Sequence, residues 1–432
     1  MTHAYLLPHP PLALPGIGRG EEQKIAKTLA ALDEVATEIA AIAPKTLVFI
    51  SPHTTVYGDY FHISPGERAT GDFARFGAGD IKMAVEYDIP LGEEIARVAK
   101  ENNLPAGGEG EGDPALDHGV MVPLWYICQR YTDCKILRIA PSGMDAQAHY
   151  RMGQCIAIAC QNLYGNAPTV LIASGDLSHK LADRGPYGFA PEGPAFDQAV
   201  CAAFQKRDLQ LLFDDAYALR REAAECGLSP CMMLAGAMHR KEVQSRLLSY
   251  EGPFGVGYAV ARLAVCPYRT LARHALESRV LGNAPSLPPG LPSALTGRQA
   301  GAFVSLHMDG RLRGCIGTIA PTCDNLALEI MQNAVSAGLR DNRFSPVTTE
   351  ELPQLTYKVD VLAPPEPITG PEALDVHRYG VIVTSGIRRG LLLPNLDGID
   401  SVPQQIAIAC QKAGIHATDP IELQRFEVIR HE

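Results

Sequence analysis

Short apolar runs alternate with helical segments through the first two-thirds of the chain, and no other sequence feature constrains the fold as strongly. Residues 22–43 place Ala, Leu and Ile at helical spacing, and residues 46–51 follow as a strand-like run that ends at Pro52. The alternation recurs in four further segments: helical 91–102, strand-like 135–140, helical 145–163 and strand-like 169–174. Such repetition predicts an α/β domain, with a mixed or parallel sheet flanked by helices.

Two more helical segments, 195–221 and 229–240, lead to a glycine-containing run at 254–265 that we expect to close this domain as a strand. A second unit is expected to begin near residue 266, because residues 267–280 have the pattern of an amphipathic helix. The sequence therefore predicts two domains, 1–265 and 266–432, which a length of 432 residues also favours.

The second unit contains the strongest hairpin signal in the chain. Asp309-Gly310 separates two apolar runs, 302–308 and 312–318. We also expect a helix at 323–339 and strands at 355–363 and 379–384. This mixture predicts an α+β domain.

The composition favours a protein that binds small molecules. The net charge of -10, with no concentrated basic segment, argues against nucleic-acid and anionic membrane surfaces. The first residues lack the basic segment of a signal peptide, and no run reaches 18 apolar residues, so we expect a cytoplasmic protein without a membrane span. Eleven scattered cysteines without a CxxC pair indicate reduced thiols rather than a zinc ribbon or an iron–sulfur cluster.

Three histidines lie in Pro- or Gly-containing segments just beyond or between apolar runs. His9 lies in PHPP, His53 follows the strand-like run 46–51, and His179 follows 169–174. Enzymes of the α/β class carry ligands on loops at the ends of their strands, where a ring nitrogen is free to face a cleft. The conjunction of these histidines indicates a metal site.

The order of four short motifs resembles a known family. HPP comes near the N-terminus, SPH follows a strand, DHG precedes an apolar PL at 117–124, and SGDLSH spans 174–179. This order is similar to that of the class III extradiol dioxygenase superfamily, which includes the catalytic subunit of protocatechuate 4,5-dioxygenase and the Memo proteins. The resemblance covers residues 1–265.

The resemblance implies roles for individual residues. His9 and His53 would hold the metal together with a carboxylate from near residue 225, a two-histidine, one-carboxylate set that suits Fe(II). His179 matches the position that moves protons, and His118 matches the histidine that lines the substrate and oxygen pocket. Asp176 would orient the His179 ring. The substrate would be a small phenolic, catecholic or related planar aromatic molecule.

The third ligand is left open between two adjacent residues, Glu225 and Cys226. Dioxygenases of this type use a carboxylate, whereas the Memo branch resembles this chain in the sequence CGxxP, which begins here at Cys226. A thiolate ligand would favour Zn or Cu over Fe(II) and chemistry other than oxygen insertion. The alternative is that Cys226 is a small buried apolar side chain.

The second unit resembles the AMMECR family through LRGCIGT at 312–318 and QNAVSAGLRDNRF at 332–344. The resemblance implies no reaction. The side chains that could form a charged pocket with one thiol are Arg313, Cys315, Arg340, Asp341 and Arg343. The alternative is a tight hairpin with a buried Cys315 and a structural Arg–Asp pair.

Fusion of the two families implies a possible radical S-adenosylmethionine enzyme as partner, since proteins of both kinds accompany such enzymes in gene sets. Three functions follow. The first is a non-haem, extradiol dioxygenase-like oxidoreductase. The second is a Memo-type metalloenzyme without ring cleavage that works with the radical enzyme on a small molecule or a protein. The third is a non-catalytic protein that binds a ligand or partner. The oligomeric state is left open, a homo-oligomer included.

Overall fold

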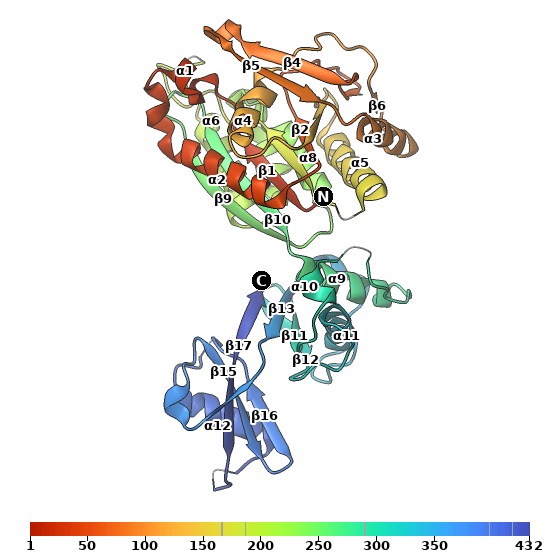
Figure 1. The fold of residues 1–432 in the computed structure, drawn as a ribbon, viewed down its shortest axis with the longest axis vertical. Helices are drawn as coiled ribbons and strands as arrows, with labels where there is room; N and C mark the ends of the chain where they lie inside the picture. Colours follow the sequence, from red (N-terminus) through yellow and green to blue (C-terminus); the bar gives the residue numbers. More distant parts are fainter. Residues whose placement is uncertain (166, 186, 289–290, 397, 417) are drawn as a thin grey trace. The chain divides into compact units, whose positions relative to one another are not determined.

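The chain forms two compact units, Met1–Val265 and Cys266–Glu432, which are described separately (Figure 1). The computed structural model describes residues 1–165, 167–185, 187–288, 291–396, 398–416 and 418–432. The first unit is an α/β domain with a mixed sheet between helices, and the second is an α+β domain, so the predicted fold classes are confirmed.

Six strands form the main sheet of the first unit, in the order β7-β2-β8-β1-β10-β9. Their bounds are β1 His3–Leu7, β2 Thr46–Ile50, β7 Lys135–Ile139, β8 Thr169–Ser174, β9 Val243–Glu251 and β10 Tyr258–Val265. Strands β7, β2, β8 and β1 are parallel to one another, whereas β10 runs antiparallel to both β1 and β9. The parallel strands end at one common edge of the sheet.

The central strands are apolar on both faces because helices cover both sides of the sheet. In β1, Ala4 and Leu6 belong to one hydrophobic core, and Tyr5 and Leu7 belong to the other. Every residue of β2 and β8 is buried. Continuous apolar runs were therefore the correct signal for these strands.

Helices α2 and α4 contribute to the core on one face, and α3, α5, α6 and α8 contribute to the core on the other. The helices of this unit are α1 Pro15–Gly18, α2 Ala26–Ile42, α3 Ile89–Glu101, α4 His118–Cys128, α5 Ala146–Tyr164, α6 Glu192–Gln205, α7 Asp215–Ala223 and α8 Leu228–Ala237. Among the described residues of the whole chain, no helix combines the length and apolar character needed to cross a bilayer.

Two parts of the first unit differ from the expected elements. The segment 195–221 is not one helix, because α6 ends at Gln205 and the chain turns through Arg207, whose φ of 61° is left-handed, before α7 begins. A hairpin of β4 Arg68–Phe73 and β5 Ala78–Glu86 was not predicted. Its alternate side chains are largely exposed, so the apolar signal is weak. The short strands β3 Phe61–His62 and β6 Ala106–Gly107 were also missed.

The second unit is built on a sheet in the order β12-β11-β13-β17-β15-β16, with β14 paired to β17. The hairpin at Asp309-Gly310 is present as β11 and β12. The elements are α9 Pro267–Val280, α10 Ser293–Thr296, β11 Ala302–Met308, β12 Arg311–Gly317, α11 Leu326–Leu339, β13 Thr356–Leu362, β14 Glu366–Ile368, β15 Tyr379–Ser385, β16 Arg388–Leu392, α12 Val402–Ala413 and β17 Glu422–His431. Helices α9 and α11 share a core with β11 and β13, and α12 packs on β15 and β16.

Helices α5 and α8 approach each other so closely that glycine is required at the contact. A β-carbon at Gly153 would lie 1.9 Å from the carbonyl oxygen of Met233, and one at Gly236 would lie 1.9 Å from that of Tyr150. Backbone atoms cannot move aside as a flexible side chain can. The two helices are therefore fixed at short range, and α8 is the helix that begins just after Cys226.

We predict that Gly153→Ala destabilises the first unit. Alanine is the better helix former by about 1 kcal/mol, but overpacking against α8 costs about 1–3 kcal/mol or more, and the packing effect should dominate. Thermal unfolding followed by circular dichroism measures the change. Gly58→Ala is the matched control, because no atom lies within 4 Å of a β-carbon there. Equal melting temperatures for the two variants would contradict the prediction.

Candidate metal centre

The candidate ligands come from loops that follow adjacent parallel strands. His9 lies two residues beyond β1, and His53 lies three residues beyond β2. His179 follows β8, which lies between β1 and β2 in the sheet. Because parallel strands end at the same edge, these three loops meet above one end of the sheet. Cys226 reaches the same place from the segment between α7 and α8.

His9, His53 and Cys226 form a group whose donor atoms all lie within 4.8 Å of one another. The Nε2 atoms of His9 and His53 are 2.9 Å apart, and the Cys226 sulfur is 3.6 Å from His9 Nε2. Around a tetrahedral ion with ordinary bond lengths, two nitrogens lie about 3.3 Å apart and a nitrogen and a sulfur about 3.6 Å apart. These side chains therefore fit one cation.

Ser174, the last residue of β8, fixes the tautomer of the His9 ring. Its hydroxyl donates to the Gly119 carbonyl oxygen, so the same hydroxyl oxygen must accept the proton from His9 Nδ1, 2.9 Å away. Nδ1 then carries the hydrogen, and Nε2 presents its lone pair to His53 and Cys226. Second-shell hydrogen bonds of this kind orient metal-ligating imidazoles in proteins.

Burial keeps the donor set neutral in the absence of a cation. Desolvation lowers the pKa of His9 well below its usual value, and the neighbouring imidazoles of His53 and His118 lower it further. Desolvation likewise raises the pKa of the Cys226 thiol well above its usual value, with Asp176 as a further cause. A bound cation reverses this balance, because it favours the thiolate and the free imidazole nitrogen.

His118 and His179 lie beside the group without belonging to it. The His118 ring stacks on the His53 ring at a centroid distance of 4.1 Å, and its pKa is lowered to about 4, mainly by desolvation. His179 Nε2 lies 3.9 Å from the Cys226 sulfur, and desolvation lowers the pKa of this ring too. Desolvation therefore favours the neutral form of both imidazoles.

Glu225 and Asp176 do not occupy the places that the sequence suggested for them. The Glu225 carboxylate accepts the Leu228 amide at 2.6 Å and pairs with Arg220 at 3.3 Å, so it caps the start of α8 instead of joining the cluster. Asp176 accepts the backbone amide of His9 at 2.9 Å. Its carboxylate makes no hydrogen bond to the His179 ring among the described residues, so Asp176 holds the His9 loop and does not orient His179.

A second glycine contact brings the Cys226 segment to the sheet. A β-carbon at Gly175 would lie 2.2 Å from the α-carbon of Gly227, so only glycine at position 175 allows the two loops to touch. The Asp176 amide donates to the Cys226 sulfur at 3.3 Å across this contact. The thiol is thus positioned by backbone packing.

Sequence reasoning missed a buried arginine behind the site. Arg138 in β7 is only 1 % exposed, and its guanidinium donates to Ser64 at 2.7 Å and lies 3.4 Å from Asp117. Asp117 in turn caps α4 and accepts the Ser51 hydroxyl at 2.5 Å, close to His118 and His53. The one charged residue inside the apolar run ILRIA was the available signal, because an unpaired charge is not tolerated there.

A cavity of about 1050 Å³ opens beside the histidines, and His53 and His118 line it. The β4–β5 hairpin supplies another part of its lining, which includes Phe76. The Phe76 ring meets the His118 ring edge to face at 5.4 Å. Tyr187 likewise stacks on the His179 ring at 5.0 Å. Neither aromatic side chain stood out in the sequence.

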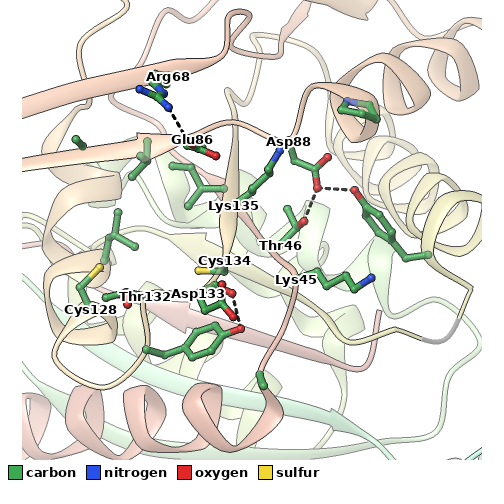
Figure 2. Close-up of a pocket in the computed structure, with 18 residues that line it drawn as sticks. Lys45, Thr46, Arg68, Glu86, Asp88, Cys128, Thr132, Asp133, Cys134 and Lys135 are labelled. Atoms are coloured by element: carbon green, nitrogen blue, oxygen red, sulfur yellow. Dashed lines mark hydrogen bonds and ion pairs between the residues drawn. The ribbon is translucent and has the colours of Figure 1, made fainter.

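A larger cavity of about 1150 Å³ lies at the opposite edge of the sheet, where Thr46 and Lys135 begin β2 and β7 (Figure 2). Figure 2 shows its buried carboxylate, Asp88, which accepts a hydrogen bond from Thr46. The Tyr164 hydroxyl donates to the same carboxylate. None of the histidines discussed above lines this cavity. The volume of a cavity alone therefore does not identify the candidate metal centre.

Only some of the five candidate residues of the second unit lie in contact with one another. Asp341 accepts the Cys315 amide at 2.9 Å and pairs with Arg343 at 2.7 Å. Arg313 pairs with Glu351 at 2.7 Å, and Arg340 lines a different cavity. The five residues therefore do not form one cluster: Arg340 caps the end of α11, whereas Asp341 and Arg343 contact Cys315.

The fold is an α/β unit with a group of side chains that could hold a metal ion, joined to an α+β unit, and the comparisons give the family. The chain belongs to the family described as the catalytic LigB subunit of aromatic ring-opening dioxygenase, whose model matches residues 3–261. The AMMECR1 family model matches residues 269–431. The two resemblances inferred from the motifs are confirmed.

Relatives of known sequence match the whole chain or its second unit. A protein of Clostridium acetobutylicum is 37% identical over 99% of this chain and 98% of its own length. A protein of Thermotoga maritima is 48% identical over 38% of this chain and 97% of its own length. The two-unit arrangement therefore recurs in a full-length relative.

Two solved structures are also similar to parts of the chain. An uncharacterized protein from Pyrococcus horikoshii is 32% identical, with a TM-score of 0.36, over 38% of this chain and 88% of its own. An uncharacterized protein from Escherichia coli K12 is 16% identical, with a TM-score of 0.41, over 61% of this chain and 100% of its own.

We predict that Ser174→Ala weakens metal binding by about 10- to 100-fold, because the His9 ring loses the acceptor that fixes its tautomer. Competition with a chromophoric chelator measures the affinity. Ser249→Ala is the control, since this buried strand serine has no hydrogen-bond partner for its hydroxyl among the described residues. An unchanged affinity in Ser174→Ala would show that the ring is held by other contacts.

Proposed function

We propose that the first unit is a metal-dependent oxidoreductase that acts on a small phenolic or related planar molecule. The observation that carries this proposal is the group of His9, His53 and Cys226 at the carboxyl edge of the sheet. Membership of the ring-opening dioxygenase family supports the substrate class. Fe(II) is the first candidate for the ion, and Zn or Cu become stronger candidates with a sulfur ligand.

The residues around the group suit proton transfer from a phenol. The bound ion would supply Lewis acidity that favours the ionised phenol. The His179 ring lies 3.9 Å from the Cys226 sulfur and is the candidate to take up a hydroxyl proton, while His118, stacked on His53, lines the same place. Phe76 contacts the His118 ring edge to face, and Tyr187 stacks on the His179 ring, so each imidazole has an aromatic neighbour.

Metal analysis of variants tests the proposed ligand set. His53→Ala and Cys226→Ala should each lose most of the bound metal, because only two donors remain. Glu225→Gln should keep it, since the carboxylate faces Arg220 and the start of α8. His274→Ala, in α9 of the second unit, is the histidine control. If Cys226→Ala kept the metal and Glu225→Gln lost it, the third ligand would be the Glu225 carboxylate and not the Cys226 thiol.

A second function is favoured by the identity of the third donor. Cys226 stands where an oxygen-inserting site of this type uses a carboxylate, and Glu225 is engaged elsewhere. A thiolate makes the site softer and favours chemistry other than ring cleavage. In this version the unit is a metalloenzyme that works with a radical S-adenosylmethionine enzyme on a small molecule or a protein.

Dioxygen consumption separates the two functions. A ring-cleaving enzyme consumes dioxygen in proportion to the catechol that disappears, because both oxygen atoms enter the product. We expect Fe(II)-loaded protein to consume dioxygen with at least one member of a panel of catechols. His179→Gln should lower the rate of dioxygen consumption by about 100-fold or more, the usual contribution of a general acid or base. Turnover that proceeds equally well without dioxygen would favour the second function.

A further inference from the structure

We propose that Asp197 is a positioning residue for His179. Its carboxylate holds the backbone of Ser178, and through Ser178 it fixes the His179 ring beside the Cys226 sulfur. The inference rests on the proposed function for the role of His179 in proton transfer, but the place of the ring can be measured without a substrate. Asp197 ends the segment GPAFD, residues 193–197, and lies in the second turn of α6.

The residue before His179 is held by several elements at once. The Ser178 amide donates to Asp197 Oδ1 at 2.7 Å. The Ser178 carbonyl oxygen accepts the Gly257 amide at 2.8 Å. The Ser178 hydroxyl and the His179 amide both donate to the Ala223 carbonyl oxygen, at 3.0 and 3.1 Å. In the bond to Asp197 the acceptor is a side chain, so a substitution can remove that bond without altering the backbone.

Two glycines allow these elements to close on Ser178. A β-carbon at Gly193, the first residue of GPAFD, would lie 2.6 Å from the Ser178 hydroxyl oxygen. A β-carbon at Gly257 would lie 2.0 Å from Asp197 Oδ2. The second distance leaves no room for a side chain at 257 while the carboxylate stays in place. Both glycines therefore serve the contact between Asp197 and the residue before His179.

The place of Asp197 is unfavourable for an ionisable group. The side chain is 1 % exposed, and desolvation raises its pKa to about 7, with Glu225 as a further cause. Such burial costs stability that an apolar side chain of similar size would not lose. The carboxylate is held by the Ser178 amide and by the Tyr250 hydroxyl, which donates at 2.7 Å. It therefore serves the geometry of the His179 loop more than the stability of the unit.

The bond to Ser178 does not need the negative charge of Asp197. When the carboxyl group is protonated, Oδ1 still accepts the Ser178 amide, and the new O–H can donate to the Tyr250 oxygen. Asparagine offers the same pattern, because its amide carries one acceptor oxygen and a donor nitrogen. Asp197→Asn should therefore keep the His179 ring in place, whereas Asp197→Ala should release it.

Chemical modification of the histidines of the full-length protein by diethyl pyrocarbonate, followed site by site through peptide masses, tests the inference. In the unsubstituted protein Tyr187 stacks on the His179 ring and shields one of its faces. In Asp197→Ala and in Gly257→Ala, we expect the rate at His179 to rise about tenfold relative to His274, because a hydrogen bond to a buried carboxylate is lost. Asp197→Asn should react like the unsubstituted protein. If Asp197→Ala does not fold, Gly257→Ala decides the test.

Tyr250→Phe is the matched control, because it removes the other hydrogen bond of the Asp197 carboxylate and leaves the bond to Ser178. This variant should lower the melting temperature, while the rate at His179 stays the same. An unchanged rate at His179 in Asp197→Ala overturns the inference. An equal rise at His179 and at His274 also overturns it, since the substitution would then loosen the whole protein.

Dioxygen consumption by Fe(II)-loaded protein with a catechol separates this inference from the proposed function. If the rate at His179 changes as expected in a protein that consumes no dioxygen, the positioning role stands and the proposed function fails. In an active enzyme, Asp197→Ala should lower kcat, while KM for the catechol and the metal content stay unchanged. A loss of metal in Asp197→Ala would place its effect at the ligands and would overturn the inference.

Discussion

Parallel pairing of β1, β8 and β2 is the constraint on which the candidate metal centre depends. The pairing aligns Leu7 with Ser174, and from there His9 turns back so that its ring reaches the Ser174 hydroxyl. A slip of one residue would point that hydroxyl to the other face of the sheet. The registry of three strands, fixed by apolar side chains on both faces, therefore determines the tautomer of a ligand.

The central strands and their histidines could be predicted from sequence because both depend on local patterns. A run such as TLVFIS is apolar on both faces only if helices cover both, and a histidine just beyond such a run must lie at the sheet edge. The β4–β5 hairpin gave no such signal, since its outer side chains face solvent. That hairpin nevertheless supplies Arg75, Phe76 and Lys82 to the cavity. A local sequence pattern does not show where such a hairpin lies relative to loops that are distant in the sequence.

The choice of the third donor shows the same limit of prediction from sequence, here for two adjacent residues. Glu225 and Cys226 are neighbours, and either side chain is chemically suited to a metal. Their directions are set by the backbone, where Ala224 has a left-handed φ of 53° and Gly227 touches Gly175. Arg340 and Arg343 differ for a similar reason, because one ends a helix and the other lies in the loop that folds back on Cys315. Residue type could be read from the sequence, but orientation could not.

The place of β1 in the sheet has a consequence for how the unit is made. This strand precedes the other strands of the unit in sequence, yet its two neighbours are β8 and β10, and β10 is the last strand of the unit. Pairing over such long sequence separations is slow, since the intervening chain must be ordered first. The loops that carry His9, His53 and Cys226 can therefore come together only after strands far apart in the sequence have paired.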